Sequence, residues 1–313
     1  MKNIFFYVAL ISLFLGACSD ESEELNINKK GVELTIQASI GNPSASRTSY
    51  VREESGMTVG WEATEELLVV SFNESGITAV DHFTSTGEAG RKKAAFSGTW
   101  NGNAGDKVIC LYPASTSIFS ATVGNPSIAF TYAAHSPFEV KDKDISKLKN
   151  WDVMIGDVVM SGTDASVKLS RKTAVLDLAF SGAADYEYGV YARYLQHIGV
   201  SAYSGSNPVL FTNAGSIATT TSTYTGDIVA SSFQGSYKSN LAQITKTGVF
   251  HYYYPVVANG TLQAGDKIRF DYEQKEYSGT KWDSWWSGTV EKTLKSSFTI
   301  TPGKIYKVGE VGL

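Results

Sequence analysis

Apolar and polar residues alternate along several short segments of the chain, which is typical of β-strands with one buried face. The clearest segment is Val32–Ile40, where every second residue is apolar without a break. The other predicted strands are bounded by Gly, Asn or Pro turn residues: 66–72, 107–112, 152–160, 174–180, 248–257, 267–272 and 297–308. Only 183–196 has a pattern that would also suit a helix. The pattern as a whole predicts an all-β fold.

The length of the folded part predicts two domains. About 280 residues follow residue 30, and single hydrophobic cores stop growing near this size. Many short strands separated by turns are typical of sandwiches. We therefore expect two tandem β-sandwiches, at 31–170 and 171–313, with four residues facing their cores: Leu34, Ile36, Leu176 and Leu178.

Residues 1–17 have the pattern of a lipoprotein signal peptide. Lys2 precedes the apolar run 4–14, which is too short to cross a bilayer as a helix. The following Leu15-Gly16-Ala17-Cys18 resembles the bacterial lipobox. This resemblance implies cleavage before Cys18, a diacylglycerol on its sulfur, an acyl chain such as palmitate on its nitrogen, and an outer-membrane location.

Residues 18–30 are polar and predict a flexible tether. The acidic run at 20–24 is similar to the surface-export signal of Bacteroides-type lipoproteins. The alternative interpretation is that this acidic run only keeps the tether solvated and is not an export signal.

Composition and charge exclude several classes of protein. The 313 residues are 42% hydrophobic and 19% charged, which argues against a disordered chain. With 27 Lys+Arg against 31 Asp+Glu, the net charge of −4 offers no electrostatic basis for a nucleic-acid partner. Compact motifs for zinc, nucleophilic serine and phosphate loops are absent from the sequence, and its four histidines are scattered. We therefore expect no metal, no cofactor and no enzymatic activity.

Trp282, Trp285 and Trp286 lie close together beside polar residues. If exposed, such aromatic rings would stack on sugar rings or contact a protein partner. The alternative is that some of them face a sandwich core. The remaining cysteine of the lipidated chain, Cys110, lies in an apolar segment and is expected to be a small buried residue.

Several segments together resemble the fimbrillin-like family, the lipoprotein-derived pilus subunits of Bacteroides-type bacteria. They are the lipobox at Cys18, the strand Val32–Ile40, and the segments 46–50, 58–62, 166–176 and 300–306. The resemblance implies two transthyretin-like, Greek-key sandwiches and a structural or adhesive subunit of a cell-surface pilus. It also implies partners: other pilus subunits, and a host or bacterial glycan or protein receptor.

The resemblance further implies donor-strand exchange after a trypsin-like protease cuts behind an arginine. In this sequence Arg47 fits best, because it follows the first strand and a connection of Ser, Pro and Gly residues. The new chain would begin at Thr48, and the segment 297–313 would be the donor, as a tail with no following element to hold it. The alternative is that Arg47 is an ordinary exposed residue and the first strand stays in place.

A different function remains open from the sequence. A surface glycan-binding lipoprotein of a polysaccharide-uptake system would share the lipobox, the acidic tether and the sandwiches. Exposure of Trp282, Trp285 and Trp286 would favour that alternative.

Overall fold

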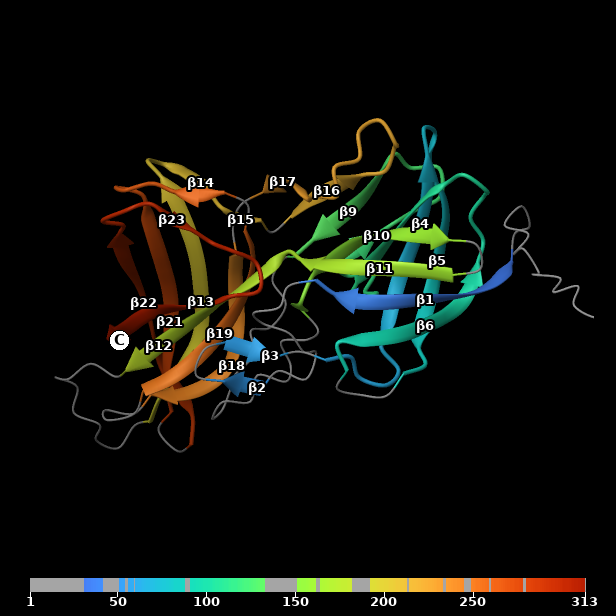
Figure 1. Ribbon diagram of the computed structural model, residues 1–313. Coiled ribbons are helices and arrows are strands. Elements are labelled where there is room, and N and C mark those ends of the chain that lie inside the picture. Colours follow the sequence, from blue (N-terminus) through green and yellow to red (C-terminus); the bar gives the residue numbers. More distant parts are fainter. Residues whose placement is uncertain are drawn as a thin grey trace, which may run out of the picture.

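The structure, a computed structural model, describes residues 31–41, 51–53, 56–58, 60–87, 91–132, 151–161, 164–181, 192–212, 214–232, 235–244, 249–258, 260–277 and 280–312. These residues form strands and no α-helix, which confirms the all-β prediction. Figure 1 shows two strand-rich bodies side by side. Within the described residues, no helix has the length and apolar character needed to cross a membrane.

Seven strands of the first body close into a barrel, in the order β1-β11-β10-β7-β4-β5-β6. Their bounds are Val32–Ile40 (β1), Glu66–Asn73 (β4), Gly76–Ser85 (β5), Lys93–Trp100 (β6), Lys107–Tyr112 (β7), Met154–Ser161 (β10) and Asp164–Arg171 (β11). The pair of β1 with β11 is parallel, and the other pairs are antiparallel. The expected first sandwich is thus a barrel closed by β1.

The barrel interior is a continuous apolar core. Alternate residues of β1 contribute Leu34, Ile36 and Ala38 to it, as the period-2 pattern predicts. Trp61, fully buried, packs edge-on against Phe96 and Tyr112, with ring centroids 5.0 and 5.5 Å apart respectively. Cys110 is also buried in this core, which confirms its expected role as a small apolar residue.

A small sheet covers one outer side of the barrel and forms a second core with it. Its strands, in the order β17-β16-β9-β8, are Val229–Ser232, Ala214–Ala218, Ser127–Thr131 and Phe119–Ser120. The core between them includes Val70 and Ile155 from the barrel and Ile217 from β16. The segment 214–232 therefore returns from the second half of the chain to the barrel (Figure 1).

The second body is a sandwich of two sheets. One sheet has the order β15-β19-β12-β24, with Phe211–Thr212, Val249–Ala258, Thr173–Ser181 and Ile305–Gly312. The other has the order β14-β13-β21-β22, with Asn207–Val209, Ala192–Ser204, Lys267–Tyr277 and Trp282–Thr293, and β18 (Gly235–Ile244) also pairs with β13. Two short pairs complete the described strands: β2 (Val51–Glu53) with β3 (Gly56–Thr58), and β20 (Thr261–Leu262) with β23 (Phe298–Thr299).

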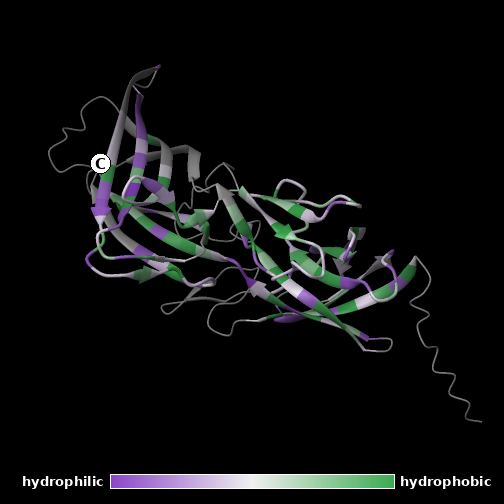
Figure 2. Cartoon of the chain, turned by 90° about the horizontal axis from the view of Figure 1, so that it is seen from above, coloured by the Kyte–Doolittle hydropathy of each residue, from purple (hydrophilic) through white to green (hydrophobic). Residues whose placement is uncertain are grey.

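The core of the sandwich lies between these two sheets. Leu176 and Leu178 of β12 face it, together with Phe270 of β21, while Asp177 lies outside this cluster. Figure 2 shows hydrophobic residues interspersed with hydrophilic ones along the strands. The four core positions expected from the sequence are all buried, which confirms the face of each strand.

The same turn precedes a strand in each body. Gly105 and Gly265 have φ angles of 83° and 95°, a conformation that glycine adopts without steric cost. The carboxylate of Asp106 accepts a hydrogen bond from the Asn103 backbone N–H, and Asp266 accepts the equivalent bond from Gln263, both at 2.7 Å. Each carboxylate therefore fixes the turn before β7 or β21.

The segment 183–196, whose pattern would also suit a helix, is a strand where the structure describes it, because 192–196 belong to β13. This strand pairs with β21 along its length, so tertiary pairing overrides the local helical pattern. The chain passes from the barrel to the sandwich at Lys172, between β11 and β12. The division into domains at 31–170 and 171–313 stays a prediction.

Candidate strand-exchange site

Strand β1 closes the barrel through backbone pairing on both of its edges. It runs antiparallel to β6, with Val32 opposite Trp100 and Ser39 opposite Lys93. It runs parallel to β11, with Ile36 opposite Ala165 at the start of that pairing. Removal of β1 would therefore leave two neighbouring strands with unpaired backbone groups.

The inner face of β1 fills alternate positions of the barrel core. Leu34, Ile36 and Ala38 are 6%, 0% and 1% exposed. Leu34 lies opposite Gly98, where a Cβ atom would come within 2.6 Å of the His82 carbonyl oxygen and 2.9 Å of the Phe83 ring. The glycine therefore allows β5 and β6 to approach closely beside Leu34.

The outer face of β1 is polar, and its side chains make exposed hydrogen bonds. The hydroxyl oxygens of Thr35 and Ser97 lie 2.8 Å apart, and Thr99 donates to Glu33 at 2.5 Å. Among the described residues, no ion pair involves a side chain of β1. Because exposed hydrogen bonds of this kind contribute little net stability, the inner face and the backbone pairing hold the strand.

Strands β1 and β24 lie end to end along one edge of β11 and β12. Leu169 accepts a backbone hydrogen bond from Gly41, at the end of β1, and Thr173 accepts one from Gly303, both at 2.7 Å. Lys172, in contrast, donates to Val153 beside β10. Alternate residues of a strand direct their backbone groups to the same side, so the odd-numbered residues face both β1 and β24.

The direction of both strands is the same. Strand β1 runs parallel to β11, and β24 runs parallel to β12 from Ile305 onward. Strand β1 therefore points toward the turn that starts β24. The edge of β11 and β12 that pairs with β1 and β24 therefore extends from the barrel to the sandwich (Figure 1).

A buried ion pair lies where the two bodies join. Arg171 Nε donates to both carboxylate oxygens of Asp152, at 2.9 and 2.6 Å, and Thr173 Oγ1 donates to the same group at 2.6 Å. The side chains of Arg171 and Asp152 are 2% and 1% exposed. Sequence reasoning did not find this cluster, although an acidic residue at the head of the apolar segment 152–160 was a usable signal.

The segment 214–232 makes a second link between the bodies. Tyr224 donates to Asp157 of β10 at 2.5 Å and lies against Phe72 of β4. Lys172 pairs with Asp227 at 2.6 Å. The chain is thus held on the barrel at more than one point.

Several residues expected to act in function lie outside the described residues. Cys18, Arg47 and Thr48 are among them. Arg47 falls in the sequence between the end of β1 at Ile40 and the start of β2 at Val51. Their predicted roles stay predictions.

The tryptophan cluster is described only in its backbone. Trp282, Trp285 and Trp286 belong to β22 and pair with Tyr277, Lys275 and Gln274 of β21. Their side chains lie outside the described part of the structure. A ligand or partner surface there stays a prediction.

The expected donor segment is paired within the fold, which corrects the expectation of an unheld tail. Strand β23 pairs with β20, and β24 pairs with β12 as an edge strand. Ile300 is buried in the sandwich core, and Phe298 packs edge-on against Tyr306 at 5.1 Å. This segment must leave β12 and β20 before it can act elsewhere.

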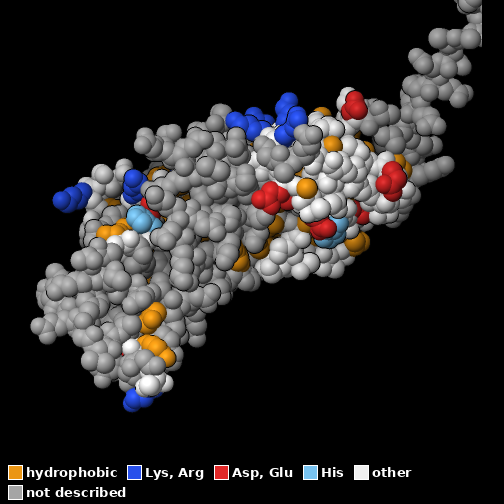
Figure 3. Space-filling model, turned by 90° about the horizontal axis from the view of Figure 1, so that it is seen from below, with side chains coloured by type: hydrophobic (Ala, Val, Ile, Leu, Met, Phe, Trp, Pro, Cys, Tyr) orange, Lys and Arg blue, Asp and Glu red, His pale blue; other side chains and the backbone are white. Residues whose placement is uncertain are grey.

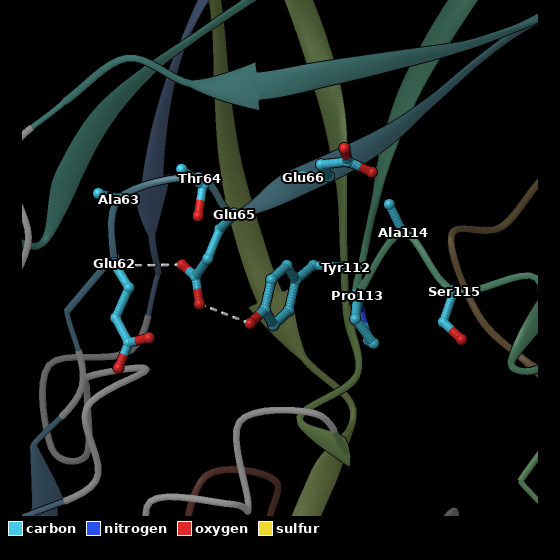
Figure 4. Close-up of a pocket in the computed structure, with 9 residues that line it drawn as sticks. All are labelled: Glu62, Ala63, Thr64, Glu65, Glu66, Tyr112, Pro113, Ala114 and Ser115. Carbon is cyan, nitrogen blue, oxygen red and sulfur yellow. Dashed lines mark hydrogen bonds between the residues drawn. The ribbon is translucent and has the colours of Figure 1, made fainter.

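A pocket of about 280 Å³ opens beside the barrel, lined by 62–66 and 112–115 (Figure 4). Glu65 accepts hydrogen bonds from the Tyr112 hydroxyl at 2.9 Å and from the Glu62 backbone N–H at 3.1 Å. Burial, reinforced by Glu65, raises the pKa of Tyr112 well above its ordinary value, so this phenol remains a donor. The Glu65 carboxylate thus links the loop at 62–65 to Tyr112 at the end of β7.

The described residues contain no group of three or more His, Cys, Asp or Glu side chains placed to hold a metal ion. On the face in Figure 3, the described acidic and basic side chains lie at separate places and not in one large patch.

The chain matches no protein-family model. It also matches no curated protein sequence. Solved structures with a similar outline include one described as an adhesin from Bacteroides ovatus, at 9% identity, covering 95% of this chain and 97% of that one, with a TM-score of 0.45. Another is described as a cell adhesion protein from Bacteroides eggerthii, at 17% identity, covering 91% and 88%, with a TM-score of 0.43.

A third similar structure is the fimbrial anchor protein Mfa2 from Porphyromonas gingivalis. It is 9% identical, the match covers 76% of this chain and 78% of that one, and the TM-score is 0.38. The three similar structures are thus described as adhesion or fimbrial proteins.

Proposed function

We propose that the chain is a structural and adhesive subunit of a cell-surface pilus, held on the outer membrane by lipid at Cys18 until it is cleaved, and then assembled by donor-strand exchange. Cleavage after Arg47 separates β1 from the rest of the chain. A strand from another subunit then takes the place of β1 between β6 and β11. The lipobox and the fimbrillin-like sequence segments support the first part of this proposal.

The position of β1 is the observation that carries the second part. This strand completes a barrel by backbone pairing on two edges, buries three alternate apolar residues, and has few outer contacts. Main-chain hydrogen bonds supply affinity for an added strand, and alternate side chains fix its register. A barrel without β1 presents both kinds of contact to an incoming strand.

Exchange also requires the connection behind β1 to be cut. Replacing Arg47 by Ala should abolish polymers while leaving a folded, membrane-bound monomer, because no new chain end would free β1. The measurement is an unheated gel of cells, combined with mass spectrometry of the N-terminal residue. Arg52→Ala is the matched control, and it should leave polymers and the Thr48 end unchanged.

Unchanged polymers in the Arg47→Ala cells would exclude this route, as would the absence of any wild-type chain that begins at Thr48. A chain that forms no polymers but is retained on polysaccharide would instead be the glycan-binding lipoprotein.

Lipid attachment is tested separately. Cys18→Ser should lose metabolic labelling with palmitate, because Cys18 supplies both acylation sites. Cys110→Ser should keep the label, since Cys110 is buried in the barrel. Equal labelling of wild type and Cys18→Ser would refute the lipoprotein assignment.

A further inference from the structure

The neighbouring residues of the barrel limit the side-chain size at each inner position of a strand that replaces β1. On β6, the residues opposite Leu34, Ile36 and Ala38 are Gly98, Phe96 and Ala94. On β11, Ala165 and Val167 lie beside Ile36 and Ala38. The three innermost positions of the site therefore accept a large, a large and a small side chain, in that order.

The third position lies in a packed core that also contains Trp61. The Trp61 backbone N–H donates to Arg91, three residues before Ala94, and its ring contacts Phe96, two residues after Ala94. Trp61, Ala94 and its partner Ala38 belong to the same core cluster. Ala38 is 1% exposed and Trp61 is fully buried, and extra atoms in such a packed core are destabilising.

The C-terminal segment of this chain does not fit that pattern. Three alternate positions can be placed within residues 297–313 in thirteen registers, and nine of these put Pro302, Lys304, Lys307 or Glu310 at one of the innermost positions. Burying an unpaired charge there is strongly unfavourable. The remaining four registers place only Ser, Thr or Gly at the first large position, which would leave a cavity there.

We infer that the strand replacing β1 comes from a different protein and not from a second copy of this chain. The inference rests on the proposed strand exchange and specifies its partner. That partner carries an extended segment with apolar residues at the five alternate positions that Val32, Leu34, Ile36, Ala38 and Ile40 occupy in β1. The residues in place of Leu34 and Ile36 are large, and the residue in place of Ala38 is no larger than alanine. This chain therefore forms mixed assemblies and no homopolymer.

Synthetic peptides test this inference on the full chain after limited cleavage by an arginine-specific protease, with the Thr48 end verified by mass spectrometry. One labelled peptide has the sequence of residues 31–41, and another that of 303–313. Two variants of the first carry Phe in place of Ala38 or of Gln37. Binding is followed by fluorescence anisotropy.

The 31–41 peptide should bind saturably, and the 303–313 peptide should not. Ala38→Phe should weaken binding about tenfold or more, since it overfills the core. Gln37→Phe is the matched control and should bind like the parent, because this residue points outward and is exposed. The cleaved protein alone should remain monomeric.

Equal binding of the 303–313 peptide, or homopolymers of the cleaved protein, would overturn the inference. Undiminished binding of the Ala38→Phe peptide would overturn the size rule. Failure of every peptide, including 31–41, would refute the strand exchange on which the inference rests, and this result is distinct from the others.

Discussion

Ile36→Asp should prevent the barrel from folding. Ile36 is fully buried, opposite Phe96 and beside Ala165, with no polar group of β1 on the same face. A carboxylate placed there must either remain charged in the core or become protonated, and either outcome costs several kcal/mol. That cost is comparable to the whole stability of a typical domain.

Gln37→Asp is the matched control, because the adjacent side chain faces solvent. Its effect on the free energy of unfolding should stay within about 0.5 kcal/mol, as for other surface substitutions. Near-UV circular dichroism and chemical denaturation measure both variants. Similar unfolding midpoints for the two would mean that β1 is not part of the barrel.

Asp152→Ala should also lower the free energy of unfolding by about 3–5 kcal/mol, the range for breaking one partner of a buried ion pair. The substitution leaves the Arg171 guanidinium buried without its carboxylate and removes the acceptor of Thr173. Because this cluster lies where β11 passes into β12, its loss should loosen the join between the barrel and the sandwich.

The control for this prediction is a surface ion pair. Lys267 and Glu291 lie 3.0 Å apart, and their side chains are 47% and 41% exposed. Glu291→Ala should therefore cost at most about 1 kcal/mol. If denaturation gave the same loss for Asp152→Ala and Glu291→Ala, the buried pair would have no special role in the junction.

Local sequence pattern was sufficient to predict individual strands. The predicted bounds of β1 and β7 agree with the structure, because uninterrupted alternation and a continuous apolar run are both local signals. The segment 297–308 was predicted as a strand with a turn at Pro302 and Gly303, and the structure divides it there into β23 and β24. Here the turn residues outweigh the apolar residues on either side.

Pairing between distant strands could not be predicted in the same way. Closure of the barrel depends on β1 lying beside β11, which follows about 130 residues later, and alternation alone names no partner. The return of 214–232 to the barrel was missed for a related reason. Its buried residues Ile217 and Ile228 are isolated within a Thr-rich stretch that reads as a loop.

The candidate site was predicted in part. The sequence identified β1 as a one-sided strand, but the shared edge of β1 and β24 depends on backbone directions that appear only when β11 and β12 are joined. The Asp152–Arg171 pair was missed because its two residues, 19 positions apart, meet only after β10 and β11 pair.

A reversible disulfide between β1 and β6 tests the release of β1 most directly. Thr35 and Ser97 are directly opposite each other on the outer face, with their hydroxyl oxygens 2.8 Å apart, so cysteines at these positions are within bonding reach. The measurement is polymer formation by cells carrying Thr35→Cys/Ser97→Cys, with and without a reducing agent, and with Thr35→Cys alone as the control. Our account predicts that the oxidised double variant is cleaved but forms no polymers, and that reduction restores them. Polymers that form equally well while the disulfide is intact would contradict it.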